Sequence, residues 1–275
     1  MNIQLIALDL DGTTLNSSGH ISEFTKETLE KAIRQGIQVV IASGRAGSAL
    51  PQDVLAIHGL NYAITSNGSS IFALPDFKRI FACDMTPETV DAVLSVAAGC
   101  GFTYEAFIAG RAYTARAYFD HPTDFGVPER MNAYVRTTRT PVPSIEDFIR
   151  SHRHEIEGID FIIPDAIKKE KIRHQLTLIP DLYITSSESY YLELAAGSVS
   201  KASALHALAS RLQIAPSQII AFGDGGNDIE LLSYAGCGVA MGNAAAILKD
   251  AADDITLSNN EDGVEFYLRK ILKFC

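Results

Sequence analysis

The first third of the chain alternates continuous apolar runs with an amphipathic segment. Ile3–Leu8, Ile37–Ala42 and Tyr62–Thr65 are short apolar runs, and strands buried on both faces of a parallel sheet lose the alternation seen in half-buried strands. Glu23–Gln35, whose apolar positions include Phe24, has the period of a helix. The pattern predicts a parallel sheet with helices between its strands.

The same rhythm returns near the C-terminus. Helices are predicted over Lys201–Leu212, Asp228–Tyr234 and Gly263–Lys273, and strands over Gln218–Phe222 and Gly238–Met241. Together the two terminal portions predict a doubly wound, Rossmann-like α/β core.

Residues 83–189 differ in character, because tyrosine, phenylalanine and arginine become frequent there. Phe102–Ile108 and Arg111–Ala117 flank an Ala-Gly pair and predict an antiparallel hairpin. We therefore predict a second α/β domain over 83–189, inserted into a core made of residues 1–82 and 190–275.

Length and composition agree with a two-part chain. The 275 residues exceed the ~150 typical of one domain, and 47% are hydrophobic and 20% charged, as in a soluble globular protein. No apolar run reaches the ~18–20 residues of a membrane helix, and the N-terminus lacks the basic flank of a signal peptide. The four cysteines show no CxxC pair or disulfide spacing, so we expect reduced thiols in a cytoplasmic protein.

The charge balance bears on partners. Acidic residues outnumber basic ones by 33 to 23, which gives a formal net charge of −10. Because nucleic-acid backbones require a basic surface, this balance argues against a nucleic-acid partner. No coiled-coil pattern predicts an oligomeric state.

Two aspartate-rich segments directly follow predicted strands. They are Asp9-Leu10-Asp11-Gly12-Thr13 and Gly223-Asp224-Gly225-Gly226-Asn227-Asp228. In open α/β sheets ligands bind at the carboxyl ends of the strands, and carboxylates gathered there would repel one another unless a cation joined them. Oxygen ligands on a rigid edge suit Mg²⁺, which the two segments therefore predict.

Simple turns and a calcium loop fit these two segments less well than a magnesium site. Asp-Gly pairs are common in turns, but a turn does not require that both segments follow apolar strands. A calcium-binding EF-hand loop needs glycine at its sixth position and glutamate at its twelfth. Counting from Asp9, those positions are Thr14 and His20, so the calcium loop is excluded.

Two further segments point to a bound anion. Ser43-Gly44-Arg45 follows the strand at Ile37–Ala42, where a hydroxyl and backbone N–H groups can cradle phosphate; an ordinary turn is the alternative. Lys201 opens a predicted helix, with Ser198 or Ser200 as N-cap. A cation is unfavourable at that end of the helix dipole unless an anion lies beside it, and a solvated surface lysine is the alternative.

In this order and on these elements, the segments resemble the motifs of the haloacid dehalogenase superfamily, and in detail those of its Cof-type phosphatases. The matching segments are Asp9-Leu10-Asp11-Gly12-Thr13, Ser43-Gly44-Arg45, Ser66-Asn67-Gly68, Ser200-Lys201 and Gly223-Asp224-Gly225-Gly226-Asn227-Asp228. The resemblance implies a Mg²⁺-dependent phosphatase. Such an enzyme would hydrolyse a small phosphorylated metabolite, such as a sugar phosphate or a phosphorylated cofactor, through an aspartyl-phosphate.

The resemblance also implies roles for the four aspartates. Asp9 would be the nucleophile, and Asp11 would be the general acid and base. The metal would be held by Asp9, Asp224, Asp228 and the backbone carbonyl of Asp11.

The remaining motif residues would bind the phosphoryl group. Those implied to hold its oxygens are Ser43, Gly44, Lys201 and Asn227. Arg45 and Asn67 lie near the site by motif position. Residues 83–189 would form a cap that closes over the site and selects the leaving group, with Arg111, Tyr113, Arg116 and His121 as candidates either for substrate contact or for ordinary packing.

Three other functions compete with hydrolysis. A phosphosugar mutase shares the core motifs and is the nearest rival. A non-catalytic phosphate-binding or sensing protein would need Asp9 but neither the proton donor Asp11 nor an inserted domain. True dehalogenation is disfavoured, because the dehalogenases that these motifs resemble lack the second aspartate.

Overall fold

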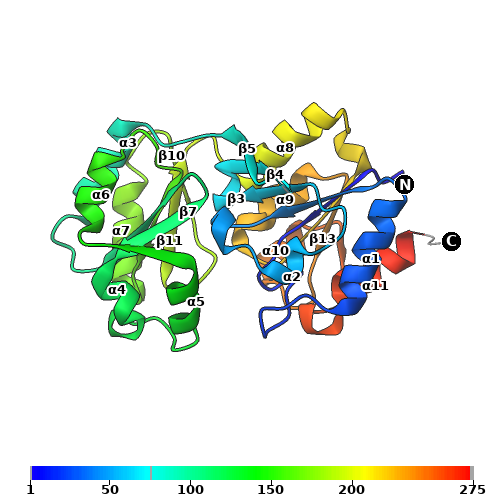
Figure 1. The fold of residues 1–275 in the computed structure, drawn as a ribbon, viewed down its shortest axis with the longest axis horizontal. Coiled ribbons are helices and arrows are strands. Elements are labelled where there is room, and N and C mark those ends of the chain that lie inside the picture. Colours follow the sequence, from blue (N-terminus) through cyan, green and yellow to red (C-terminus); the bar gives the residue numbers. More distant parts are fainter. Residues whose placement is uncertain (1, 75, 273–275) are drawn as a thin grey trace. The chain divides into compact units, whose positions relative to one another are not determined.

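The computed structural model describes residues 2–74 and 76–272, which form two compact units (Figure 1). The core unit comprises residues up to 45, residues 50–81 and residues from 200 onward. The inserted unit comprises Ala46–Ala49 and Ala82–Val199. Each unit is built on its own sheet.

The core unit contains an eight-stranded sheet. In spatial order its strands are β14 (Asp254–Ile255), β13 (Cys237–Ala240), β12 (Ile219–Gly223), β1 (Leu5–Leu8), β2 (Gln38–Ala42), β3 (Tyr62–Thr65), β4 (Ser70–Ala73) and β5 (Lys78–Ala82). The six strands from β14 to β3 pair in parallel, and β4 pairs antiparallel to β3. All four residues of β1 are buried, as expected for a central strand covered on both faces.

Helices cover both faces of this sheet. They are α1 (Glu23–Arg34), α2 (Gln52–Leu55), α8 (Lys201–Leu212), α9 (Ile229–Tyr234), α10 (Ala246–Ala251) and α11 (Gly263–Ile271). From β1 the chain adds β2 and then β3 toward one edge of the sheet. From β12, beside β1, it adds β13 and then β14 toward the opposite edge. Because parallel crossovers are right-handed, α1 and α2 cover one face while α9 and α10 cover the other; α11 packs on α1, and α8 packs on α9.

The inserted unit contains a six-stranded sheet. In spatial order its strands are β10 (Leu182–Thr185), β11 (Tyr191–Ala196), β9 (Gly158–Ile162), β6 (Thr103–Ile108), β7 (Arg111–Ala115) and β8 (Arg139–Val142). Its helices are α3 (Pro87–Ala97), α4 (Arg116–Asp120), α5 (Met131–Thr138), α6 (Ile145–Ser151) and α7 (Ala166–Leu176). Apolar residues of α3, α6 and α7 pack with one face of the sheet. Acidic residues lie along part of the other face, and apolar residues of α4 and α5 pack with another part of it.

The predicted α/β class is confirmed: a doubly wound parallel sheet carries an inserted α/β unit. The predicted boundary near residue 190 lies too early, because β11 pairs with β9 and β10 and so belongs to the inserted sheet. The second strand of the predicted hairpin ends at Ala115, where the chain enters α4. The C-terminal helix is described as far as Ile271; Lys273, its predicted end, lies outside the described residues.

Other expectations from composition concern thiols and membranes. Cys83, Cys100 and Cys237 are free thiols, and Cys275 lies outside the described residues. Among the helices of the described chain, none is long and apolar enough to cross a membrane.

The burial of β1 generates a prediction about stability. Ile6→Ala removes a side chain that is 0% exposed at the centre of the sheet, whereas Ile247→Ala removes one that is 65% exposed on α10. We expect the first variant to lose ~2–5 kcal/mol of unfolding free energy through the cavity it leaves, and the second to change little. Urea unfolding followed by circular dichroism measures both, and equal effects would contradict the placement of β1 in the core.

Candidate active site

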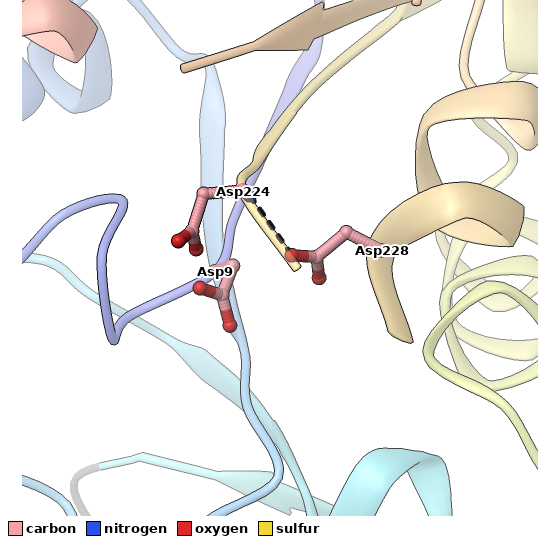
Figure 2. Close-up of side chains that lie close together, drawn as sticks. All are labelled: Asp9, Asp224 and Asp228. Atoms are coloured by element: carbon pink, nitrogen blue, oxygen red, sulfur yellow. Dashed lines mark hydrogen bonds between the residues drawn. The ribbon is translucent and has the colours of Figure 1, made fainter. Parts of the chain in front are cut away.

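The site lies where the strand order reverses, between β1 and β12. Asp9 directly follows β1 and Asp224 directly follows β12, and these neighbouring strands are parallel, so both residues emerge at the same edge. Asp228 begins the turn into α9, where its backbone N–H donates to the Gly225 carbonyl. Each of the three aspartates offers a carboxylate oxygen within 4.8 Å of the others (Figure 2).

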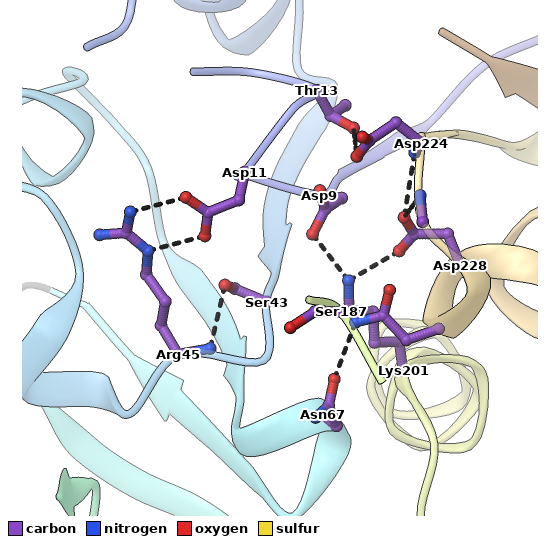
Figure 3. A network of polar contacts seen from close by, with 12 residues as sticks. Asp9, Asp11, Thr13, Ser43, Arg45, Asn67, Ser187, Lys201, Asp224 and Asp228 are labelled. Atoms are coloured by element: carbon purple, nitrogen blue, oxygen red, sulfur yellow. Dashed lines mark hydrogen bonds and ion pairs between the residues drawn. The ribbon is translucent and has the colours of Figure 1, made fainter. Parts of the chain in front are cut away.

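Lys201 is buried between two of these carboxylates. Its ammonium donates to Asp9 Oδ1 and to Asp228 Oδ1, each at 2.7 Å (Figure 3). The side chain is 1% exposed, so the surface-lysine alternative is wrong. Ser200 is the N-cap of α8 and accepts from the Ser203 N–H, which fixes the backbone from which Lys201 projects.

The charges in this cluster do not cancel. Three carboxylates against one ammonium leave two formal negative charges in a buried place. Burial, together with the charges of Asp228 and Asp224, raises the pKa of Asp9 well above its ordinary value despite Lys201. Burial would lower the pKa of Lys201, but the charges of Asp228 and Asp9 outweigh it, so this pKa lies above its ordinary value. A divalent cation would neutralise the excess.

The donor set fits a hard divalent cation, because it consists of oxygen ligands alone. Asp224 accepts from Thr13 Oγ1 at 3.1 Å and keeps most of its acceptor capacity. Asp228 is more fully engaged: Oδ1 accepts from Lys201, and Oδ2 accepts from the N–H groups of Asp224 and Gly225 at 3.1 and 3.0 Å. Asp228 is therefore suited above all to holding the loop and Lys201 in place, and Asp9 and Asp224 are the more available ligands.

The loop after β1 fits tightly against Asp224. Gly12 has φ +78°, and a Cβ built on it would lie 2.2 Å from Asp224 Oδ2, so only glycine is tolerated there. Asn243 Nδ2 donates to the Gly12 carbonyl at 2.8 Å and lies 3.4 Å from Asp224 Oδ2. Sequence reasoning missed Asn243 and the hydroxyl of Thr13. The signal available was that Asn243 follows another parallel strand, β13, at the same edge.

Asp11 points away from the carboxylate cluster. Its carboxylate is exposed and accepts from Arg45 in a bidentate pair, Nε to Oδ2 at 2.8 Å and Nη2 to Oδ1 at 2.7 Å (Figure 3). Ser43 Oγ accepts from the Arg45 N–H at 3.1 Å. The side chains of Asp11 and Arg45 thus link the loops after β1 and β2.

Asn67 joins the remaining motif residues. Asn227 Nδ2 donates to Asn67 Oδ1 at 3.0 Å, and the Asn67 N–H donates to the Ser43 carbonyl at 3.2 Å. A Cβ on Gly44 would lie 3.1 Å from Asn67 Oδ1, and one on Gly68, where φ is +111°, would lie 2.2 Å from the Ser200 carbonyl. Glycine at these positions lets the loops after β2 and β3 meet the start of α8.

The core unit therefore brings together the residues predicted for catalysis, phosphate and metal. The candidates for substrate contact, Arg111, Tyr113, Arg116 and His121, belong to the inserted unit. Tyr113 packs against Phe148 of α6 with ring centroids 4.6 Å apart, which indicates a packing role. Arg116 pairs with Asp120 one helical turn later, at 3.9 Å.

The repulsion at Asp224 predicts a pH-dependent stability. Burial and the charge of Asp228 raise the pKa of Asp224 from 3.8 to about 6. A carboxyl whose pKa is higher in the folded state than in the unfolded state destabilises the fold as pH rises through that interval. Without metal, Asp224→Asn should therefore stabilise the protein by ~1–2 kcal/mol at about pH 7.5, and the gain should vanish near pH 4.

Thermal unfolding in chelator at the two pH values measures this effect. Asp250→Asn, at an exposed position on α10, is the matched control and should change neither melting temperature. A lower melting temperature for Asp224→Asn at pH 7.5 would mean that its carboxylate is a net stabilising group.

Comparison with known proteins identifies the family. A model described as haloacid dehalogenase-like hydrolase matches residues 6–268. Phosphatase YwpJ of Bacillus subtilis (strain 168) is 31% identical over 290 residues, covering 98% of this chain and 100% of its own. The 5-amino-6-(5-phospho-D-ribitylamino)uracil phosphatase YcsE of the same organism is 29% identical, covering 98% of this chain and 96% of its own.

The fold comparison agrees. A solved haloacid dehalogenase-like hydrolase from B. subtilis matches with a TM-score of 0.84 at 29% sequence identity, covering 98% of this chain and 100% of that one. The match includes both units, and the resemblance read from the motifs is confirmed. The chain belongs to the haloacid dehalogenase-like hydrolase family, within which it is a phosphoric monoester hydrolase.

Proposed function

We propose that the protein is a Mg²⁺-dependent phosphatase that hydrolyses small phosphorylated metabolites through an aspartyl-phosphate on Asp9. The observation that carries the proposal is the Asp9 carboxylate itself. It sits at the strand-order reversal, with Oδ1 held by Lys201 at 2.7 Å and an oxygen of Asp224 close by. One carboxylate oxygen is fixed, and the other remains for attack on phosphorus.

In the first step, an oxygen of Asp9 forms a bond to phosphorus while the bond from phosphorus to the ester oxygen breaks. The departing alkoxide takes a proton from Asp11. In this structure Asp11 accepts from Arg45 with both oxygens, so its role as acid requires it to exchange the guanidinium for the leaving group. In the second step, water attacks the phosphorus of the aspartyl-phosphate, gives a proton to Asp11, and releases phosphate and Asp9.

The polar groups around Asp9 are suited to holding the phosphoryl oxygens. The Lys201 ammonium comes from the start of α8, and the Ser43 hydroxyl and the backbone at Gly44 come from the loop after β2. The Asn227 amide comes from the loop after β12, and Asn67 links these two loops. Fixed donors of this kind stabilise the charge that develops in phosphoryl transfer. Asp9, Asp224 and the Asp11 carbonyl would hold Mg²⁺, with Asp228 binding or orienting its shell. When bound, the ion neutralises the carboxylates and the phosphoryl charge.

Two further points define the proposed reaction. The relative YcsE is named as a phosphatase of a phosphorylated ribityl compound, which supports a small alkyl phosphate as substrate here. We also propose that the inserted unit acts as the cap that selects the leaving group.

Substitution of the two N-terminal aspartates tests the mechanism. Asp9→Asn removes the nucleophile and should abolish turnover. Asp11→Asn should lose ~10²–10⁴-fold with an alkyl phosphate such as glucose 6-phosphate. The loss should be smaller with 4-nitrophenyl phosphate, because that leaving group departs without a proton.

The assay is release of inorganic phosphate, with Asp250→Asn as a control that should retain full activity. Near-normal turnover by Asp9→Asn would rule out Asp9 as the nucleophile. Formation of an isomeric sugar phosphate without release of phosphate would identify a mutase instead.

Metal removal tests the cofactor. Dialysis against chelator should abolish phosphate release, and Mg²⁺ should restore it. Asp224→Asn should need a much higher Mg²⁺ concentration for half-maximal activity, because it loses a charged oxygen ligand. Full activity in chelator would contradict a metal-dependent mechanism.

A further inference from the structure

The polar face of the inserted sheet carries a row of side chains that the proposed mechanism does not use. Glu193 on β11 lies opposite Asp160 on β9. Asp160 lies opposite Glu105 on β6, and Thr114 on β7 lies opposite Glu105 on its other side. Directly opposed residues share one face of a sheet, with Cβ atoms about 5 Å apart. We call Glu193, Asp160, Glu105 and Thr114 the acidic row.

The unit itself supplies partners for two of the three carboxylates. Glu105 is 0% exposed and is held by Arg139, with Nε at 3.0 Å from both carboxylate oxygens and Nη2 at 2.7 Å from Oε2. Glu193 accepts from the Ser187 N–H at 3.2 Å and from the Ser187 hydroxyl. These contacts are those of a built polar network.

Asp160, at the centre of the row, has no such partner. The described residues donate no hydrogen bond to its carboxylate. Lys169, a buried cation of the same unit, donates to Ser186 Oγ and to the Ser189 carbonyl instead, each at 2.8 Å. Burial and then the charges of Glu193 and Glu105 raise the pKa of Asp160 well above its ordinary value, and the charge of Arg139 offsets them only in part.

Two buried hydroxyls, one in the acidic row and one beside it, have no hydrogen-bond partner of normal geometry among the described residues. Thr114 is 0% exposed and shares the face of Glu105, yet its Oγ1 has no hydrogen-bond partner among the described residues. The hydroxyl of Tyr191, two positions before Glu193 on the same face of β11, makes no hydrogen bond of normal geometry either. The Tyr191 hydroxyl lies close enough to the Tyr118 hydroxyl to interact with it. Buried polar groups are nearly always paired, so the Thr114 hydroxyl is the atom that indicates an absent partner.

The arrangement is unfavourable for a purely structural network. Like charges directly opposite each other destabilise a sheet, and a partly buried carboxylate without hydrogen bonds adds a desolvation penalty. A ligand that brings positive charge and several hydrogen-bond donors would relieve both.

The chemistry of the row narrows the ligand. An anionic group would add to the repulsion. A metal ion is not favoured, because the described chain has its one grouping of three metal-competent side chains at Asp9, Asp224 and Asp228. An ammonium group carries one positive charge and three donors, which suit a carboxylate that lies between two further carboxylates.

We propose that the acidic row binds the primary ammonium group of a small molecule, with Asp160 as the main acceptor. The site goes beyond the proposed hydrolysis, and its binding test does not depend on that reaction. The ammonium could belong to the leaving group of an amino-sugar phosphate or to a separate amine, and the experiment distinguishes these sources.

The test titrates the full chain with glucosamine and with glucose, which differ by one amino group, using calorimetry. Glucosamine should bind at least about tenfold more tightly, because a charge-assisted hydrogen bond is added. Asp160→Asn keeps the side-chain shape and should abolish the difference in affinity between the two sugars. Glu193→Gln should reduce that difference without abolishing it. Asp147→Asn, exposed on α6 against the opposite face, is the matched control and should preserve it.

Equal binding of the two sugars by the unaltered protein, or a preference that survives Asp160→Asn, would overturn the proposal. Stability gives a second readout without ligand: Asp160→Asn should raise the melting temperature, because it removes an unpaired charge. A lower melting temperature would show that the carboxylate is a structural group and would also overturn the proposal.

Hydrolysis identifies the source of the ammonium. If the ratio of kcat/KM for glucosamine 6-phosphate over glucose 6-phosphate falls in Asp160→Asn, the ammonium belongs to the substrate. If binding depends on Asp160 and that ratio does not, the ligand is a separate amine. Failure of the unaltered protein to release phosphate from 4-nitrophenyl phosphate would count against the proposed hydrolysis and leave the binding result intact.

Discussion

The ion pairs of Lys201 with Asp9 and Asp228 are the interactions on which the site depends. Three carboxylates converge where β1 and β12 end, and they could not be buried together without a cation among them. Lys201 neutralises one of the three charges and leaves an excess of two, which suits a divalent ion. The same arrangement fixes Asp9 before any substrate arrives.

Much of the surrounding structure serves that arrangement. Gly68 lets the loop after β3 approach the start of α8, from which Lys201 projects. Gly12 lets the loop after β1 approach Asp224, and Asn243 ties that loop to the end of β13. The two glycines have no side chain to bury, yet each permits a close approach between segments far apart in the sequence.

The residues at strand ends could be predicted because sheet topology alone brings them together. Asp9, Asp224 and Lys201 stand next to recognisable strands or helix starts, and the structure places them in one cluster. Asn243 also follows a strand at this edge, but its contacts with Gly12 and Asp224 depend on a loop conformation that no local pattern specifies. The pairing of Asp11 with Arg45 is likewise a contact between two loops.

The errors in the fold predicted from the sequence have similar causes. β11 is a buried strand that directly precedes a helix of the core unit. Its sequence therefore does not show whether it belongs to the core sheet or to the inserted sheet. Phe24 fits the apolar period of the predicted helix, but its side chain is 68% exposed. The apolar period shows where a helix lies without showing which of its residues face the core. The acidic row depends on register across four strands, which single-strand patterns do not reveal.

The central claim is that phosphate passes through a covalent bond to Asp9. The stereochemical course at phosphorus tests it most directly, using a monoester made chiral with three oxygen isotopes and analysing the phosphoryl group after transfer to an acceptor alcohol. Two successive in-line displacements, first by Asp9 and then by the acceptor, predict retention of configuration. Inversion would mean a single displacement by the acceptor and would contradict the account.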